Sequence, residues 1–427
     1  MEAGTEVGAS DRGAGLFQED REDLRIVASL EGVLEVVHTR LAGLSASGGG
    51  LSGERFVSDP EPEDAAALAR GVPPPSRSPE AFGEHRPSPR LDPSAARGEI
   101  ERILLEVRRA WGEGPLAVGA RWVSFRQGVR FAGPATPLRE DVRQGARVRL
   151  EVRGPAGESA VVERTLRPGE SLDAAGLSRE AAGRARERAG AVAASPGEVA
   201  AVFAPGAGGV VLHELVGHAL EADTVESGES LLASAGGRVA PEEVTVVDDP
   251  SRGRAPWRWD DEGAQAEPVR LVEAGRVSGV VHDLGTARRA GAAANGHGRR
   301  SSFRQRVRPR LGCTYLAAGR RDPAEAFEGL TRGIHVRRIE TASVDTGRGL
   351  ATFRVTDADR IVEGRLEAPL QPFLIEVSAL ATLSTLDRIA SDLAFDACVG
   401  SCVRDGQPLA ISVGAPTFRA GLIRVVT

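Results

Sequence analysis

Two histidines and a glutamate within one short stretch have the residue types of a hydrolytic metal site. The stretch is His213-Glu214-Leu215-Val216-Gly217-His218, and the residues on either side of it are apolar. Neutral imidazole nitrogens are good zinc ligands, and a neighbouring carboxylate can take and return a proton. Together they indicate hydrolysis by a metal-activated water.

The spacing of the two histidines requires an irregular helix. They are five residues apart, whereas the better-known zinc-protease helix spaces them by four. On a regular helix they would point about 140° apart, but one widened π-type turn would bring both to one side. Gly217 would ease this distortion and leave room beside a metal. The alternative is a buried helix with two hydrogen-bonded histidines and a surface Glu214.

A catalytic zinc takes three protein ligands, so a third one must come from elsewhere. The residues alone leave several candidates open, namely Cys313, Cys398, Cys402, Glu221, Asp223 and the remaining histidines. A thiolate is a good zinc ligand, and a glycine lies just before Cys402. Cys398 is its main rival, and Cys402 could instead be a small buried hydrophobe.

Further motifs follow the histidine helix in a fixed order. The helix motif itself extends to His213-Glu214-x-x-Gly217-His218-x-x-Glu221-x-Asp223. The later ones are Val244–Asp249, Asp260–Gly263, Asn295–Arg300, Thr314–Leu316 and Gly400–Gln407. This series resembles the TldD/PmbA family of bacterial metallopeptidases over about residues 198–427, and only weakly before that. Because the metal motif is kept, the chain resembles the TldD-type subunit rather than the PmbA-type partner.

The resemblance implies a third ligand and a function. It points to Cys402, so that His213, His218 and Cys402 would hold one Zn²⁺ per chain, with Glu214 as general base. Cys313 lies where the family usually has asparagine, so we expect it to be a packing residue or a neighbour of the substrate pocket. It implies a metallopeptidase of the HExxxH type that hydrolyses unfolded or extended peptides, which strands near the cleft would capture by backbone pairing. It also implies a homodimer, or a heterodimer with a PmbA-like subunit.

Two other functions stay open. One is a non-catalytic or regulatory subunit of a TldD/PmbA-type complex, in which the fold is kept while the N-terminal half has diverged. The other is a metal-dependent hydrolase that acts on a different amide. Within the leading hypothesis, both degradation and specific maturation of peptides are compatible with the sequence.

Three residues are candidates for supporting the metal chemistry. Glu221 and Asp223 could accept hydrogen bonds from the histidine rings, or form a solvated helix end. Tyr315 is the only tyrosine of the chain and a candidate donor to a transition-state oxyanion.

A polar segment after residue 290 suggests substrate binding. Asn295, His297 and Arg300, together with Arg299, could hold a peptide carboxylate by charge-assisted hydrogen bonds. The alternative is a basic surface loop. We expect the acidic run Asp260–Glu262 to form a turn or an interface, because no EF-hand spacing follows it.

The composition argues against several other classes of protein. The chain has 427 residues, of which 41% are hydrophobic, and a net charge of −6, which gives no general attraction to nucleic acid. Its apolar runs are too short to span a membrane. Three cysteines make no disulfide framework, and the first residues lack a secretory pattern. We therefore expect a cytoplasmic protein without nucleic-acid or membrane partners.

An α+β fold must position these residues. We expect residues 1–93 to be poorly defined, partly loop or disordered, and residues 94–196 to form a mixed α/β N-terminal domain. Residues 197–427 should form a β-rich metallopeptidase domain, with the metal-binding helix at the domain junction.

Local patterns place the main elements. Helices are expected at 100–111, 177–194 and 383–393, from apolar residues on one helical face or from composition. Strands are expected where apolar and polar residues alternate. They lie at 122–131, 147–166, 199–204, 244–247, 269–273, 277–282, 336–355 and 409–426, with turns expected at 154–157, 274–275 and 345–347.

Overall fold

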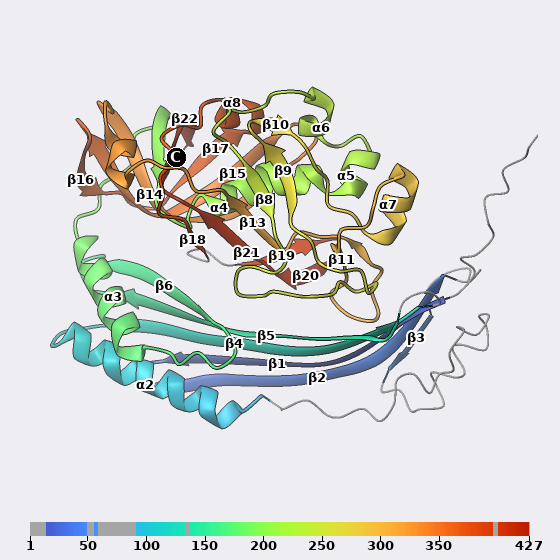
Figure 1. Ribbon diagram of the computed structural model, residues 1–427. Helices are drawn as coiled ribbons and strands as arrows, with labels where there is room; N and C mark the ends of the chain where they lie inside the picture. Colours follow the sequence, from blue (N-terminus) through green and yellow to red (C-terminus); the bar gives the residue numbers. More distant parts are fainter. Residues whose placement is uncertain (1–13, 49–54, 59–90, 134–136, 396–399, 427) are drawn as a thin grey trace, which may run out of the picture.

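One long, curved antiparallel sheet forms the lower layer of the protein in Figure 1, and the C-terminal half lies above it. The computed structural model describes residues 14–48, 55–58, 91–133, 137–395 and 400–426. The sheet has the strand order β3-β2-β1-β4-β5-β6. Its strands are β1 (Ala14–Ser29), β2 (Gly32–Gly48), β3 (Arg55–Ser58), β4 (Ala117–Ala132), β5 (Arg139–Arg153) and β6 (Ser159–Leu166).

The expectation that residues 1–93 are poorly defined is wrong for 14–48, which form the β1–β2 hairpin and pair with β4 inside this sheet. The reason lies in how β1 is buried. Its early residues Phe17 and Glu19 are buried on one face, whereas Leu24 and Ile26 are buried on the other. Because the buried face changes along the strand, no steady alternation marks it in the sequence. Residues 1–13, 49–54 and 59–90 of that segment lie outside the described residues.

Two helices cover one face of the sheet. Helix α2 (Pro93–Trp111) begins at Asp92, whose carboxylate accepts hydrogen bonds from the backbone of the first turn, and the expected apolar face is buried. Helix α3 (Ala174–Glu187) ends earlier than its composition suggested. Both pack on the central strands in one hydrophobic core that includes Ile100, Val148 and Leu177.

The C-terminal half contains two six-stranded sheets, in the orders β10-β9-β8-β13-β21-β18 and β14-β7-β22-β17-β15-β16. In the second sheet β14 also pairs with β15, which closes five strands into a ring. The strands are β7 (Gly197–Phe203), β8 (Val246–Asp248), β9 (Val269–Glu273), β10 (Arg276–Val277), β13 (Cys313–Leu316), β14 (Arg332–Asp345), β15 (Leu350–Val362), β16 (Arg365–Pro369), β17 (Phe373–Ser378), β18 (Ala394–Phe395), β21 (Ser412–Ala415) and β22 (Phe418–Val426).

Two small sheets and several short helical segments complete this half. The small sheets are β11 (Gly298–Arg299) with β12 (Arg308–Pro309), and β19 (Ser401–Arg404) with β20 (Gln407–Ala410). The helical segments are α4 (Gly209–Leu212), η2 (His213–Gly217), η3 (His218–Leu220), α5 (Ala222–Glu226), α6 (Leu231–Ala235), α7 (Leu284–Ala290), η4 (Pro323–Phe327) and α8 (Ala379–Ser384). The helix expected at 383–393 is wrong for most of that range, because α8 ends at Ser384.

The segment from α4 to η3 lies between the two large sheets of the C-terminal half, and its apolar side chains belong to their shared core. The chain contains both helices and mostly antiparallel strands, and the expected α+β class is confirmed. In the described part of the chain, no helix is both long and apolar enough to cross a membrane.

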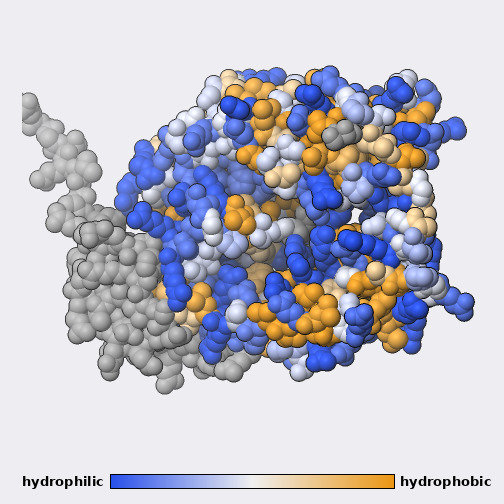
Figure 2. Space-filling view, turned by 180° about the vertical axis from the view of Figure 1, so that it is seen from behind, coloured by the Kyte–Doolittle hydropathy of each residue, from blue (hydrophilic) through white to orange (hydrophobic). Residues whose placement is uncertain are grey.

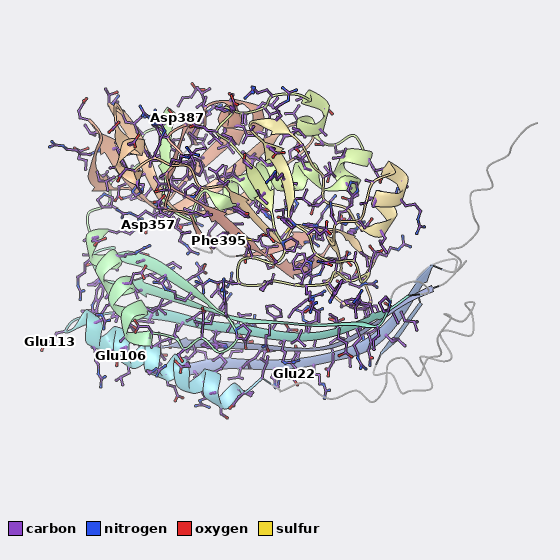
Figure 3. The ribbon with its side chains drawn as sticks, viewed as in Figure 1. Glu22, Glu106, Glu113, Asp357, Asp387 and Phe395 are labelled. Atoms are coloured by element: carbon purple, nitrogen blue, oxygen red, sulfur yellow. The ribbon has the colours of Figure 1, made fainter. Side chains whose placement is uncertain are left out.

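Buried ion pairs join the N-terminal sheet and the end of helix α3 to the C-terminal half. Arg143 of β5 pairs with Asp261 at 2.5 Å. The acidic run Asp260–Glu262 thus contributes to an interface, which was one of its two expected roles. At the end of α3, Arg188 pairs with Asp357, which Figure 3 labels above this helix, at 3.1 Å. Seen from behind, the molecule is hollowed between the two layers, and hydrophilic side chains border the hollow (Figure 2).

Candidate metal centre

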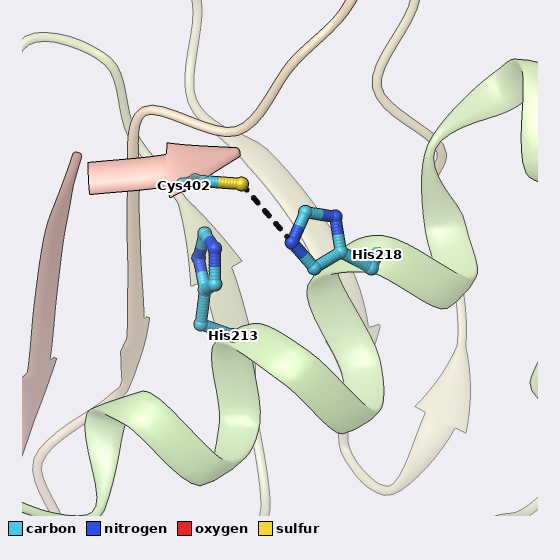
Figure 4. A group of neighbouring side chains, drawn as sticks. All are labelled: His213, His218 and Cys402. Atoms are coloured by element: carbon cyan, nitrogen blue, oxygen red, sulfur yellow. Dashed lines mark hydrogen bonds between the residues drawn. The ribbon is translucent and has the colours of Figure 1, made fainter. Parts of the chain in front are cut away.

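The histidine helix contains the widened turn that its spacing predicted. Residues His213–Gly217 form a π-helix between α4 and a final 3₁₀ turn. The two imidazole rings consequently lie on the same side, with ring centres 4.8 Å apart and nearly perpendicular planes (Figure 4). On a regular helix the two histidines would point in different directions, and the wider π-turn brings them to the same side.

Gly217 allows close packing of the π-turn, whereas we expected it to leave room beside a metal. Its backbone is ordinarily helical, but a Cβ here would lie 2.5 Å from Leu311 Cδ1 and 3.4 Å from Thr314 Oγ1. Such a contact is too close for a real Cβ. The glycine therefore lets the helix approach the segment that leads into β13, rather than leaving room beside a metal.

Cys402 lies beside the two histidines, although it is far from them in the sequence. It is on β19, and its Sγ is 3.2 Å from His218 Nε2. The potential ligand atoms of His213, His218 and Cys402 all lie within 4.8 Å of one another. Cys313 is fully buried on β13, in agreement with a packing role. The rival ligand Cys398 falls outside the described residues.

These three side chains fit a zinc ion. His213 Nδ1 is 3.1 Å from Thr314 Oγ1, while His213 Nε2 is buried and meets no hydrogen-bond partner among the described residues. A buried nitrogen without a partner is costly unless something binds its lone pair. Two imidazoles and a thiolate are a donor set that zinc favours.

The electrostatics of the site favour a cation. Burial alone would raise the pKa of the Cys402 thiol, but the neighbouring imidazoles of His218 and His213 outweigh it and lower the pKa to about 5. Burial would likewise lower the pKa of His218, yet Glu221 and Cys402 raise it well above its usual value. The thiolate, which is the form that binds metals, is therefore favoured.

Glu214 extends from the same helix toward the cavity. One carboxylate oxygen accepts a hydrogen bond from Thr341 Oγ1 of β14 at 2.8 Å, and the other lies 3.6 Å from His218 Nε2. Thr341 thus fixes the direction of the carboxylate. The other oxygen stays beside the candidate ligand His218.

These groups line one cavity of about 890 Å³ between the two layers. One wall carries His213, Glu214, His218 and Cys402; the opposite wall comes from the N-terminal sheet through Arg147, Arg149 and Glu163. Residues of β14 and the β19–β20 hairpin complete the lining. The cavity is large enough for several residues of an extended peptide.

Of the two acidic residues that follow the helix, only one contacts a candidate ligand. Glu221 is fully buried and lies 2.9 Å from His218 Nδ1, where it fixes the ring. It also pairs with Arg404. Asp223 instead pairs with Arg404 at 2.9 Å and with Arg308 at 3.2 Å, so the expected contact with a histidine ring is wrong for this residue.

The other candidates for substrate binding do not line the cavity. Arg300 is buried against the N-terminal sheet, where its Nη1 lies 2.9 Å from Ser45 Oγ. Asn295 bonds the backbone of His282 and Val280. His297 is fully buried 3.1 Å from Asp248. All three lie outside the cavity with their polar atoms bonded within the protein, so the predicted substrate contact is wrong.

Tyr315 is also outside the cavity. Successive residues of a strand point to opposite faces, so Thr314 faces the metal helix while Tyr315 packs against Phe395 with ring centres 5.5 Å apart. The oxyanion role expected for Tyr315 is therefore wrong.

The sequence reasoning missed Thr314, Thr341 and Arg404 as neighbours of the site. Thr314 and Arg404 lie within motifs that carried the family resemblance, so position within those motifs was a usable signal. Thr341 lies in a strand without such a motif, and no feature of the neighbouring sequence distinguishes it from other residues.

Comparison with known proteins agrees with this geometry. Residues 196–426 match the model of the PmbA/TldA metallopeptidase C-terminal domain. A metalloprotease of Methanothermobacter thermautotrophicus is 32% identical over 213 residues, which are 49% of this chain and 46% of that protein. A zinc metalloprotease TldD homolog of Saccharolobus solfataricus is 26% identical over 228 residues, 52% of this chain and 50% of that protein. The chain thus spans about half the length of the curated relatives it matches.

Solved structures share the fold over nearly the whole chain. TldE from Thermococcus kodakarensis superposes with a TM-score of 0.76 at 18% identity, over 98% of this chain and 97% of that one. A putative modulator of a DNA gyrase from Thermotoga maritima superposes with a TM-score of 0.70 at 14% identity, over 95% of each chain. The match of more than half of the sequence to the family model shows that the chain belongs to the TldD/PmbA metallopeptidase family.

Proposed function

We propose that this protein is a zinc-dependent peptidase that hydrolyses extended or unfolded peptides. The observation that carries the proposal is the cluster of His213, His218 and Cys402 with a buried, unpartnered His213 Nε2. These residues would hold one Zn²⁺ per chain. When bound there, zinc supplies a Lewis acid and lowers the pKa of a water molecule.

Glu214 is proposed as the general base. Its carboxylate lies beside the candidate ligands and is oriented by Thr341. From this position it can accept a proton from an attacking water and return it to the amine that leaves. Thr341 holds the first oxygen, so the proton would be held at the second.

The free edge of β14 is proposed to bind the substrate. Strand β7 pairs with β14 only from Gly333 to Val336, and among the described residues no strand pairs with that edge beyond it. Ile339, Glu340 and Thr341, which continue β14, line the cavity. An extended peptide that adds to this edge would gain backbone hydrogen bonds and pass Glu214. Recognition through the backbone tolerates many sequences.

The assembly and the location belong to the same proposal. We infer a homodimer or a heterodimer with a PmbA-like subunit, supported by the shared fold with TldE. A partner would close the hollow between the layers further and restrict it to unfolded chains. The cytoplasm, as expected from the sequence, is the proposed compartment.

Metal analysis combined with peptide cleavage tests the function. We expect one zinc per wild-type chain, cleavage of an unstructured peptide mixture, and loss of both after treatment with a chelator. His213→Ala should lose the zinc. Activity that survives complete metal removal would refute the proposal, and a chain that takes up no zinc from zinc-containing buffer would favour a non-catalytic or regulatory subunit.

A further inference from the structure

A buried chain of hydrogen bonds leads from His213 away from the cavity. His213 Nδ1 lies 3.1 Å from Thr314 Oγ1, which lies 2.7 Å from Asp248 Oδ2. The other oxygen of Asp248 lies 3.1 Å from His297 Nε2. None of these four side chains is more than 2% exposed. They join the candidate metal ligand to motifs whose role the proposed reaction does not explain.

Strand pairing fixes the middle of this chain. Thr314 of β13 and Asp248 of β8 are direct antiparallel partners. The backbone N–H of Gly312 also donates to Asp248, at 2.8 Å. At the far end, His297 Nδ1 lies 2.9 Å from the backbone oxygen of Asn295. Every member therefore has its position set by regular backbone structure or by a backbone contact.

The hydrogen-bond inventory determines which way the protons point. Burial opposes ionisation of Asp248, but hydrogen bonds from His297, Gly312 and Thr314, with the charge of His297, lower its pKa. The carboxylate is thus an acceptor only, so the single hydroxyl proton of Thr314 is donated to it. Thr314 Oγ1 is then left to accept a proton from His213, which places that proton on Nδ1. The lone pair of His213 consequently lies on Nε2, on the side of Cys402 and His218.

We propose that Thr314, Asp248 and His297 form a positioning relay that holds His213 in the Nδ1–H tautomer and aims its Nε2 at the metal. The inference rests on the proposed zinc site. Each member acts through His213 and contacts neither substrate nor metal. A carboxylate behind a histidine ligand fixes the ring and increases its basicity, and losing such a group typically costs 10- to 100-fold in metal affinity.

Matched substitutions at Thr314 separate this role from packing. Thr314→Val keeps the shape and removes the hydroxyl, whereas Thr314→Ser keeps the hydroxyl and removes a methyl group. Zinc affinity is measured by competition with a chromophoric chelator, and the melting temperature of the metal-free protein is measured in parallel. We expect Thr314→Val to bind zinc about 10- to 100-fold more weakly and Thr314→Ser to stay within about threefold of wild type.

The neighbouring carboxylate provides a control. Asp249 is also buried, but it bonds Ser251 and Arg252 and has no link to His213. Asp248→Asn should weaken zinc binding to a degree similar to Thr314→Val, and Asp249→Asn should leave the affinity unchanged. Equal zinc affinities for wild type, Thr314→Val and Asp248→Asn, all folded, would overturn the relay.

A readout without zinc keeps the relay testable if the proposed function fails. In metal-free protein labelled with ¹⁵N-histidine, the buried Nδ1–H of His213 should give a protected proton resonance that is absent in His213→Ala. We expect this resonance to persist in Thr314→Ser and to disappear in Thr314→Val. A wild-type protein that lacks it would overturn the relay, whereas a wild type that shows it but binds no zinc would overturn only the proposed function.

Discussion

Glu163 of β6 and Arg338 of β14 form a buried ion pair between the N-terminal sheet and the C-terminal half, with Oε2 and Nη2 2.7 Å apart. Their side chains are 4% and 7% exposed. Arg149 and Glu340 extend the pair to a group of four charges with separations of 3.2–3.4 Å. Since all four line the metal cavity, the group ties one wall of that cavity to the other.

Breaking this pair should loosen the two layers. Glu163→Gln leaves a buried guanidinium with less compensation, so we expect the free energy of unfolding to fall by about 3 kcal/mol. The double variant Glu163→Leu with Arg338→Met should recover most of this loss, because no charge remains buried. Urea denaturation measures both. Glu273→Gln, which removes the exposed pair with Arg270, should cost less than about 0.5 kcal/mol.

Glu214→Gln should separate metal binding from catalysis. The amide keeps the shape of the side chain and cannot accept a proton, so we expect zinc content to be unchanged and kcat to fall by about 10²- to 10⁴-fold. Metal analysis and steady-state cleavage of an unstructured peptide measure the two effects. The matched control Glu226→Gln removes a carboxylate that pairs with Arg289 outside the cavity, and should leave kcat as in wild type. Wild-type turnover by Glu214→Gln would remove the base from the mechanism.

Gly217→Ala should destabilise the π-turn by crowding rather than by backbone strain. The backbone conformation suits alanine, but the new Cβ would overlap Leu311 Cδ1, and such overpacking costs about 1–3 kcal/mol. Thermal unfolding measures the loss. Gly98→Ala is the control, because a Cβ there meets open space within α2 and should stabilise the protein by about 0.5–1 kcal/mol. A Gly217→Ala variant as stable as wild type would show that the helix can shift away from Leu311.

Glu262 should make stability fall with rising pH. Burial and the charge of Asp260 raise the pKa of Glu262 to about 8, and burial raises that of Asp260 to about 6. The folded state therefore favours the protonated carboxyls. Their contribution to the free energy of unfolding is fully present below about pH 4 and is lost as the pH rises through 8. Asp283 and Arg300 are the other charges that act on Glu262.

Denaturation of Glu262→Gln between pH 5 and pH 9 checks this sign. Relative to wild type, the variant should gain stability as the pH rises, by a difference on the order of 4 kcal/mol across the range. The exposed Glu267→Gln should follow the wild-type curve at every pH. Parallel curves for wild type and Glu262→Gln would show that Glu262 titrates alike in the folded and unfolded states.

The features of the site that are close in sequence could be predicted, and those that depend on strand pairing could not. The five-residue spacing of His213 and His218 predicted a π-turn, because helix geometry alone relates the two side chains. The place of Thr314 depends on the register of β13 against β8, which only the folded sheet defines. Similarly, a basic segment in the sequence did not reveal that Arg300 packs against the ring of Phe17, almost three hundred residues earlier.

The π-turn also limits how this helix can be related to zinc-protease helices with the four-residue spacing. Deleting Leu215 would leave His-Glu-Val-Gly-His, which has the common four-residue spacing. Every residue after the deletion would, however, rotate by about 100° and move by about 1.5 Å relative to those before it. Glu221 would then leave its place behind His218, and His218 would leave Cys402. A single insertion or deletion therefore cannot convert one spacing into the other unless the strand that carries the third ligand moves as well.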